Sequence, residues 1–66
     1  MKYLIKAFDK KTKTLYQIQS DDLKIIEDKA LLYKAQGLDY KIYHYYPVIG
    51  YREIKLTGDG GYALVI

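Results

Sequence analysis

The sequence predicts an α+β fold in which a single helix packs on one face of a mainly antiparallel sheet of four or five strands. Three observations support this prediction. Segments with strand periodicity surround one segment with helical periodicity, glycine or polar turns separate the segments, and no repeat or linker divides the 66 residues. Residues 1–66 are therefore expected to form a single domain with the element order ββαββ(β).

Two alternating segments at the start of the chain predict a hairpin. In residues 2–8 one face is apolar and the other carries both lysines, and in residues 14–20 apolar side chains alternate with glutamines. The polar run 9–13 separates the two segments. It begins with Asp9, whose carboxylate can accept backbone hydrogen bonds at the start of a turn. The first two strands should therefore pair with each other.

The segment after residue 20 predicts a helix that ends at Gly37. Ser20 or Asp21 can cap its first turn. Ile25 and Leu32 make its apolar arc wider than one sheet face requires, so we expect them to cover a sheet edge or to meet another subunit. The central stripe of this arc consists of Leu23, Ile26, Ala30 and Tyr33.

The second half of the chain predicts three further strands. Residues 38–46 alternate strongly, and their helix-facing side should include His44. A turn at 47–50 leads to a fourth strand at 51–57. A glycine-rich turn then leads to a short fifth strand at 62–66, whose last residue we expect to be paired into the sheet.

The order of the strands in the sheet stays open between two arrangements. Up to the fourth strand, the order and lengths of the elements resemble the ββαββ β-grasp domains of bacterial immunoglobulin-binding surface proteins. This resemblance concerns the fold alone and implies no function. In the other arrangement the helix returns the chain so that the third strand lies antiparallel beside the first, which gives the sheet order 2-1-3-4-5. Both arrangements place one helix across one sheet face.

The residue types argue against catalysis and against bound metals or cofactors. The chain has no cysteine, and its acidic residues are isolated or lie at the helix start, so we expect no metal site. His44 is the single histidine, and its helix-facing position favours a packed role in which it bonds a tyrosine or the backbone. The glycine-rich turn at 58–61 lacks the Lys-Ser/Thr pair of a phosphate-binding loop. We therefore predict no enzyme and no cofactor.

The first nine residues contain no long apolar stretch, because Lys6 and Asp9 interrupt them. This pattern fits neither a signal peptide nor a membrane span. The absence of cysteine is compatible with a reducing compartment. We expect a cytoplasmic protein that does not act on membranes.

The formal net charge of +3 is concentrated in the first hairpin, where five lysines face one aspartate in residues 1–20. A basic patch of this kind can attract nucleic acid or an acidic protein, although lysine-rich turns are also common for solubility alone. If nucleic acid is the ligand, phosphates would contact Lys2, Lys6, Lys10, Lys11 and Lys13.

Tyrosines provide the strongest functional indication, because five of the nine lie between residues 40 and 51. A strand alternates its side chains, so a run this dense cannot place every ring on one face. Tyr43 and Tyr45 should stand on the side of the sheet opposite the helix. Tyrosine enrichment is typical of protein interfaces. The expected partner-binding residues are Tyr43, Tyr45, Lys41, Phe8 and Leu4, with Leu15 on a neighbouring strand.

Together these observations favour a small non-enzymatic protein-binding module or inhibitor that acts through an exposed aromatic sheet face or through a sheet edge. By analogy, small inhibitors of phage or mobile-element origin work in this way. A homodimer is also expected, because the helix arc and the open side of the sheet are more apolar than a monomer needs. The alternative is a nucleic-acid-binding module with lysines on phosphates and tyrosines stacked on bases. The sequence does not identify the partner.

Overall fold

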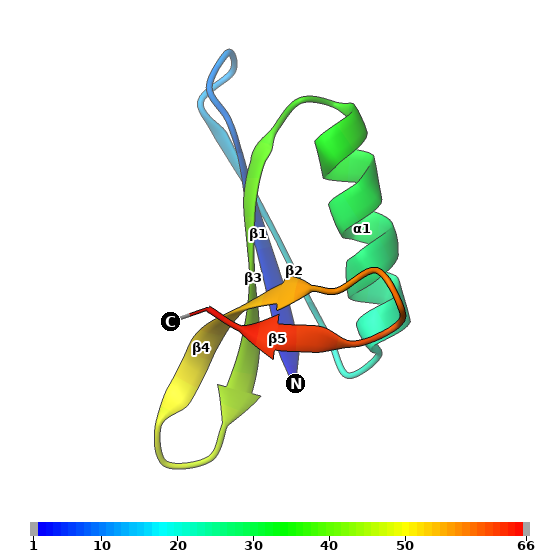
Figure 1. Ribbon diagram of the computed structural model, residues 1–66. Coiled ribbons are helices and arrows are strands. Elements are labelled where there is room, and N and C mark those ends of the chain that lie inside the picture. Colours follow the sequence, from blue (N-terminus) through cyan, green and yellow to red (C-terminus); the bar gives the residue numbers. More distant parts are fainter. Residues whose placement is uncertain (1, 66) are drawn as a thin grey trace.

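The computed structural model describes residues 2–65 and places one helix against one face of a five-stranded antiparallel sheet (Figure 1). This confirms the predicted α+β class and the order ββαββ(β). The helix is α1 (Leu23–Ala35). The strands are β1 (Tyr3–Asp9), β2 (Thr14–Ser20), β3 (Asp39–Tyr46), β4 (Gly50–Leu56) and β5 (Tyr62–Leu64).

The strands lie in the order β2-β1-β3-β4-β5, and every neighbouring pair is antiparallel. The helix carries the chain from β2 across the sheet, so β3 pairs with the free side of β1. The arrangement suggested by the β-grasp resemblance is therefore wrong, and the second arrangement is confirmed. The register decides between the two, because β3 occupies the free side of β1 along its length, from the pair Tyr3–His44 to the pair Phe8–Asp39.

One row of aliphatic side chains crosses the whole sheet on the side that α1 covers. The register aligns one residue from each strand in this row: Ile18, Ile5, Ile42, Ile54 and Leu64. The central members of the row are buried, and Ile26 of α1 is buried against the same cluster. Strand alternation and the helical repeat bring these residues together. The rest of the buried cluster consists of Ala7, Ala30 and Tyr33.

The helix begins later than the predicted caps. Asp22 is the N-cap, and its carboxylate accepts a hydrogen bond from the Lys24 amide at 2.9 Å. Ser20 instead accepts the Asp22 amide through its hydroxyl oxygen at 3.0 Å. Asp21 accepts the Lys2 amide at 3.0 Å and so joins the β2–α1 connection to the start of β1. The two predicted caps therefore stabilise the connection rather than the first helical turn.

Glycines adopt positive φ angles at two of the predicted boundaries. Gly37 follows the helix with φ 74°, as expected for a glycine that ends a helix. In the β4–β5 turn Gly58 has φ 87°, and the Asp59 carboxylate accepts hydrogen bonds from the Thr57 hydroxyl and the Gly61 amide. These two bonds, the first above all, lower the pKa of Asp59. The predicted turn at 58–61 is confirmed.

The fifth strand is shorter than the predicted span of 62–66. It ends at Leu64, after which the Val65 amide donates to the Glu53 carbonyl at 3.1 Å. The predicted pairing of the last residue, Ile66, lies outside the described residues. Three strand residues and one further backbone bond thus attach the described end of the chain to β4.

The apolar arc of α1 is wider than the core that it covers. Ile25 is 45% exposed and Leu32 is 46% exposed, so the protomer covers only about half of each side chain. Beside them, the Tyr33 ring stacks on the Tyr16 ring of β2 at a centroid distance of 6.0 Å. Ile25 and Leu32 therefore cover the sheet edge only in part.

We predict that Ile26→Ala lowers the free energy of unfolding by about 2–5 kcal/mol, because a fully buried side chain would leave a cavity. Leu31→Ala is the matched control, since Leu31 lies on the same helix and is exposed. It should change the free energy by less than about 0.5 kcal/mol. Urea denaturation of both variants measures the difference. Equal losses would contradict the assigned core.

Candidate functional site

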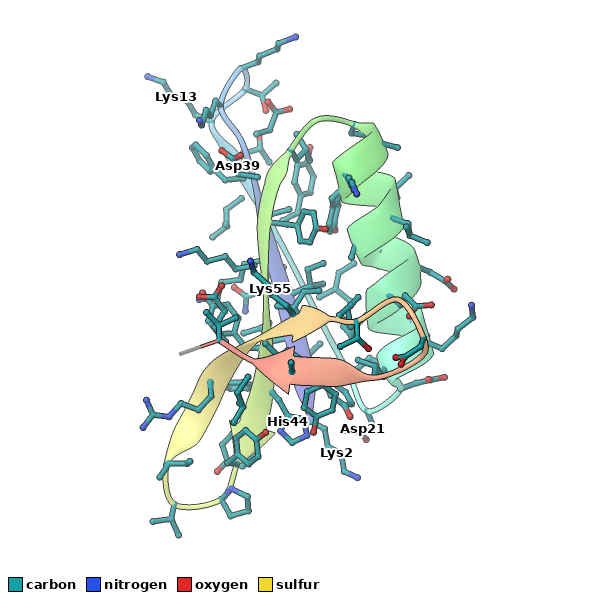
Figure 2. All side chains as sticks on the ribbon, in the orientation of Figure 1. Lys2, Lys13, Asp21, Asp39, His44 and Lys55 are labelled. Carbon is teal, nitrogen blue, oxygen red and sulfur yellow. The ribbon has the colours of Figure 1, made fainter. Side chains whose placement is uncertain are left out.

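The side of the sheet opposite α1, termed the open face, has no helix to cover it. Strand register assigns the side chains that point to this face. Figure 2 shows two of them, Asp39 and Lys55, on the side of the sheet away from α1. The aromatic and aliphatic members are Leu4, Phe8, Leu15, Tyr43, Tyr45 and Tyr51. The sequence-predicted partner-binding residues thus share one face.

Exposure differs among these residues. Phe8 and Leu15 are opposite each other in the register, and both are exposed. Tyr45 is 43% exposed, in agreement with strand alternation. Tyr43 points to the same face but is half-buried, and the Lys6 ammonium lies 5.8 Å from the centre of its ring. A cation over an aromatic ring at this distance is attracted by the ring's negative face.

Leu4 is not accessible, although it lies on the open face as predicted. Its side chain is only 5% exposed, and it stands apart from the cluster beneath α1. In the register it lies between Gln19 of β2 and Tyr43 of β3. The prediction of Leu4 as a contact residue is therefore wrong, because longer side chains flank it on both neighbouring strands.

A shallow hollow of about 270 Å³ lies on the open face between Phe8, Leu15 and Tyr43. Lys6 and Lys41, which are opposite each other in the register, also line it. Its size is below the range of about 300–1,000 Å³ that is typical of small-molecule sites. The hollow therefore suits a protruding side chain of a partner better than a metabolite.

The β3–β4 hairpin extends the apolar surface to its tip. Tyr45 and Tyr51 are opposite each other, and their rings meet edge to face at 5.2 Å. Beyond them, Val48 is fully exposed and Ile49 is largely exposed. The sequence prediction treated 47–50 only as a turn and missed these two residues. The available signal was the pair of β-branched residues after a proline, where turns usually carry polar residues or glycine.

Val48 has a strained backbone. Its φ angle is 76°, a region that β-branched residues rarely adopt. A proline followed by a residue of positive φ is the pattern of a type II turn, in which glycine normally occupies the second position. Strain of this kind persists only where the surrounding structure imposes it, and it is frequent at functional sites.

His44 lies among tyrosine rings at the helix-covered side of the sheet. Its ring centre is 4.8 Å from Tyr3, 4.4 Å from Tyr46 and 5.3 Å from Tyr62. These contacts agree with the predicted packed histidine, but its buried Nδ1 atom has no hydrogen-bond partner in the described structure. Burial, followed by the proximity of Tyr62, raises the pKa of Tyr3 and of Tyr46.

The lysines of the nucleic-acid alternative are spread over the sheet. Lys10, Lys11 and Lys13 lie at the β1–β2 turn, where Lys10 forms an exposed ion pair with Asp39 at 3.1 Å. Lys2 lies at the other end of β1, as Figure 2 shows. The remaining one, Lys6, is beside the hollow, together with Lys41. The predicted phosphate-binding residues thus form separate groups.

Two further kinds of site find no support in residues 2–65. In this part of the chain α1 is neither long nor apolar enough to cross a membrane. The same residues contain no group of three or more His, Cys, Asp or Glu side chains able to hold a metal ion.

We predict that Val48→Gly raises the free energy of unfolding by up to about 1 kcal/mol. Relief of the left-handed strain, about 1–2 kcal/mol, should exceed the entropic cost of glycine, about 0.5–1 kcal/mol. Ile49→Gly is the control, because Ile49 lies in the same turn without a positive φ angle. This control should lower stability, as thermal or urea unfolding can measure. A loss of stability in Val48→Gly equal to that in the control would contradict the strain.

Comparison of the chain with protein-family models, with curated proteins and with solved structures found no match.

Proposed function

We propose that this protein is a small non-enzymatic binding module that covers a surface of another protein with its open face and hairpin tip. The observation that carries this proposal is that exposed apolar side chains gather at both ends of the open face. One group is Phe8 and Leu15 beside the hollow, and the other is the Tyr45–Tyr51 pair with Val48 at the hairpin tip. Exposed apolar patches often mark interaction sites.

The tyrosine pair is suited to be the energetic centre of such an interface. Tyrosine offers large contact area at a low cost in side-chain entropy, and tyrosines are frequent hot spots. Tyr45 and Tyr51 already contact each other in the free protein. Binding should therefore restrict their rotamers less than it would restrict isolated rings.

The charges of the open face indicate the kind of surface that it fits. Lys6, Lys41 and Lys55 point to this face, against Glu53 and an Asp39 that is already paired with Lys10. An apolar patch with acidic groups at its border would complement this arrangement. We therefore propose an acidic protein surface as the target.

The proposed mode of action is inhibition or regulation by occlusion. A module of this size can block a functional surface without chemistry of its own. Its place of action would be the cytoplasm, which the absence of cysteine supports. The analogy with small inhibitors of phage or mobile-element origin concerns only this mode of action.

Nucleic-acid binding is the second candidate function. The observation in its favour is the group of Lys10, Lys11 and Lys13 at one end of the sheet, near the exposed ring of Phe8. Against it, the Lys6 ammonium already lies over the Tyr43 ring, which would otherwise stack on a base.

We predict that the double variant Tyr45→Ser with Tyr51→Ser weakens partner binding at least about tenfold, because it removes the centre of the interface. Leu31→Ser is the matched control, since it removes an exposed apolar side chain from the opposite side of the molecule. Each protein is immobilised, exposed to a lysate of the native host, and the retained proteins are quantified by mass spectrometry. Proteins retained by the wild type and by Leu31→Ser should be lost from the double variant. Equal retention by all three would contradict the proposal.

The nucleic-acid candidate makes a separate prediction about salt. Phosphate contacts release counterions, so the logarithm of the binding constant for single-stranded DNA should fall with the logarithm of salt concentration. Replacing Lys10, Lys11 and Lys13 by Ala should reduce this slope by about 2, at roughly 0.7 per phosphate contact. Fluorescence anisotropy over a salt series measures it. No binding at low salt would remove this candidate and leave the protein partner.

A further inference from the structure

The outer edge of β2 carries backbone N–H and C=O groups that no strand of the described sheet pairs with. Because these groups point alternately to the two sides of a strand, the residues that carry them can be identified. The Lys2 carbonyl accepts the Tyr45 amide, so the even-numbered residues of β1 direct their backbone groups to β3. The odd-numbered residues of β1 then face β2, where they lie opposite even-numbered residues. The backbone groups that point outward from β2 are therefore those of Leu15, Gln17 and Gln19.

This edge lacks the features that normally keep edge strands apart. Natural edges are blunted by charged side chains, proline, bulges or short length. β2 has seven residues, Thr14–Ser20, without a charge, a proline or a glycine, although 29% of the chain is charged. Its register with β1 runs without a bulge from end to end. The edge is therefore open to pairing with a further strand.

Exposed apolar side chains border the same edge on both sides of the sheet. On the open face this residue is Leu15, and on the helix side it is Tyr16. Tyr33 stacks on Tyr16, which identifies the flank of α1 that lies nearest β2. At 100° per residue, Ile25 and Leu32 lie about 80–100° around the helix from Tyr33, both on the side of Tyr33 that faces away from the core residue Ile26. The half-exposed flank of α1 therefore overhangs the β2 edge.

We propose that a second copy of this chain pairs with this edge, β2 against β2, around a two-fold axis at Gln17. In this antiparallel register Gln17 lies opposite the partner's Gln17, and Leu15 lies opposite the partner's Gln19. All outward N–H and C=O groups of the three residues then find partners, which gives about six hydrogen bonds between the copies. The two sheets of five strands become one continuous sheet.

Charges at the two ends of β2 support this orientation and this register. Lys13 precedes the strand and Asp21 follows it, and Figure 2 shows them at opposite ends. Antiparallel pairing around Gln17 brings the Lys13 end of each β2 beside the Asp21 end of the other copy. Parallel pairing would place like charges together, which is unfavourable.

The same register also matches the side chains on the helix side. Tyr16 lies opposite the partner's Ile18, and aromatic and β-branched residues form favourable cross-strand pairs. Both copies of α1 lie on the same side of the joined sheet, so the overhanging Ile25 and Leu32 of each copy face the other across the axis. Apart from Leu15, which the Gln19 of the second copy would flank, the open faces stay free in this dimer, so it does not rest on the proposed function.

The test uses opposite charges at the residue on the axis. Gln17→Lys and Gln17→Glu each place like charges directly opposite each other, and each should raise the dimer dissociation constant about fivefold. An equal mixture of the two should form a heterodimer with an affinity within about twofold of the wild type. Sedimentation equilibrium measures the constants, native mass spectrometry identifies the heterodimer, and circular dichroism confirms that the exposed substitutions leave the fold intact.

The matched control is the pair Gln19→Lys and Gln19→Glu, which changes the same edge away from the axis. Gln19 lies opposite the partner's Leu15, so mixing these two variants brings no opposite charges face to face. If only the mixture of the two Gln17 variants regains the dimer affinity of the wild type, the proposed dimer is supported. A wild-type protein that stays monomeric at millimolar concentration overturns it, and so does equal rescue by the Gln19 mixture.

Discussion

The row of aliphatic side chains beneath α1 determines most of the structure. Because side chains alternate along a strand, burial of Ile5, Ile42 and Ile54 on one side fixes which residues point to the other. A shift of one residue in β1, β3 or β4 would expose the isoleucine of that strand and turn Lys6, Lys41 or Lys55 toward the core. Lys41 and Tyr43 therefore lie on the open face, because Ile42 between them in the sequence must be buried.

A single helix can cover only one face of such a sheet. With 13 residues, α1 buries the centre of the aliphatic row, covers the β2 edge only in part and leaves the open face without cover. Soluble domains usually make uncovered surfaces polar, yet here they carry Phe8, Leu15 and the Tyr45–Tyr51 pair. Val48 is another exposed apolar side chain, and it stands at a position where glycine would suit the backbone better. Stability alone does not account for these choices, whereas the proposed contact with a partner would.

Local patterns were sufficient to predict the elements and their faces, because alternation and helical spacing depend on neighbouring residues in the sequence. The strand order depends on pairing between distant segments, so two arrangements stayed open until the register was known. The local pattern predicts an exposed Leu4, but Leu4 is buried. Its burial depends on Gln19 and Tyr43 of the neighbouring strands, which are distant in the sequence. The sequence does not predict Val48 as part of the proposed binding surface, because the pattern of 47–50 indicates only a turn.

The central claim is that the open face contacts another protein, and photocrosslinking in the native host tests it most directly. A benzophenone amino acid is introduced at position 45 on the open face or at position 31 on the outer side of α1, both of which are exposed. The account predicts a crosslink from position 45 to one dominant acidic protein and no such product from position 31. The same product from both positions, or none from position 45, would contradict it.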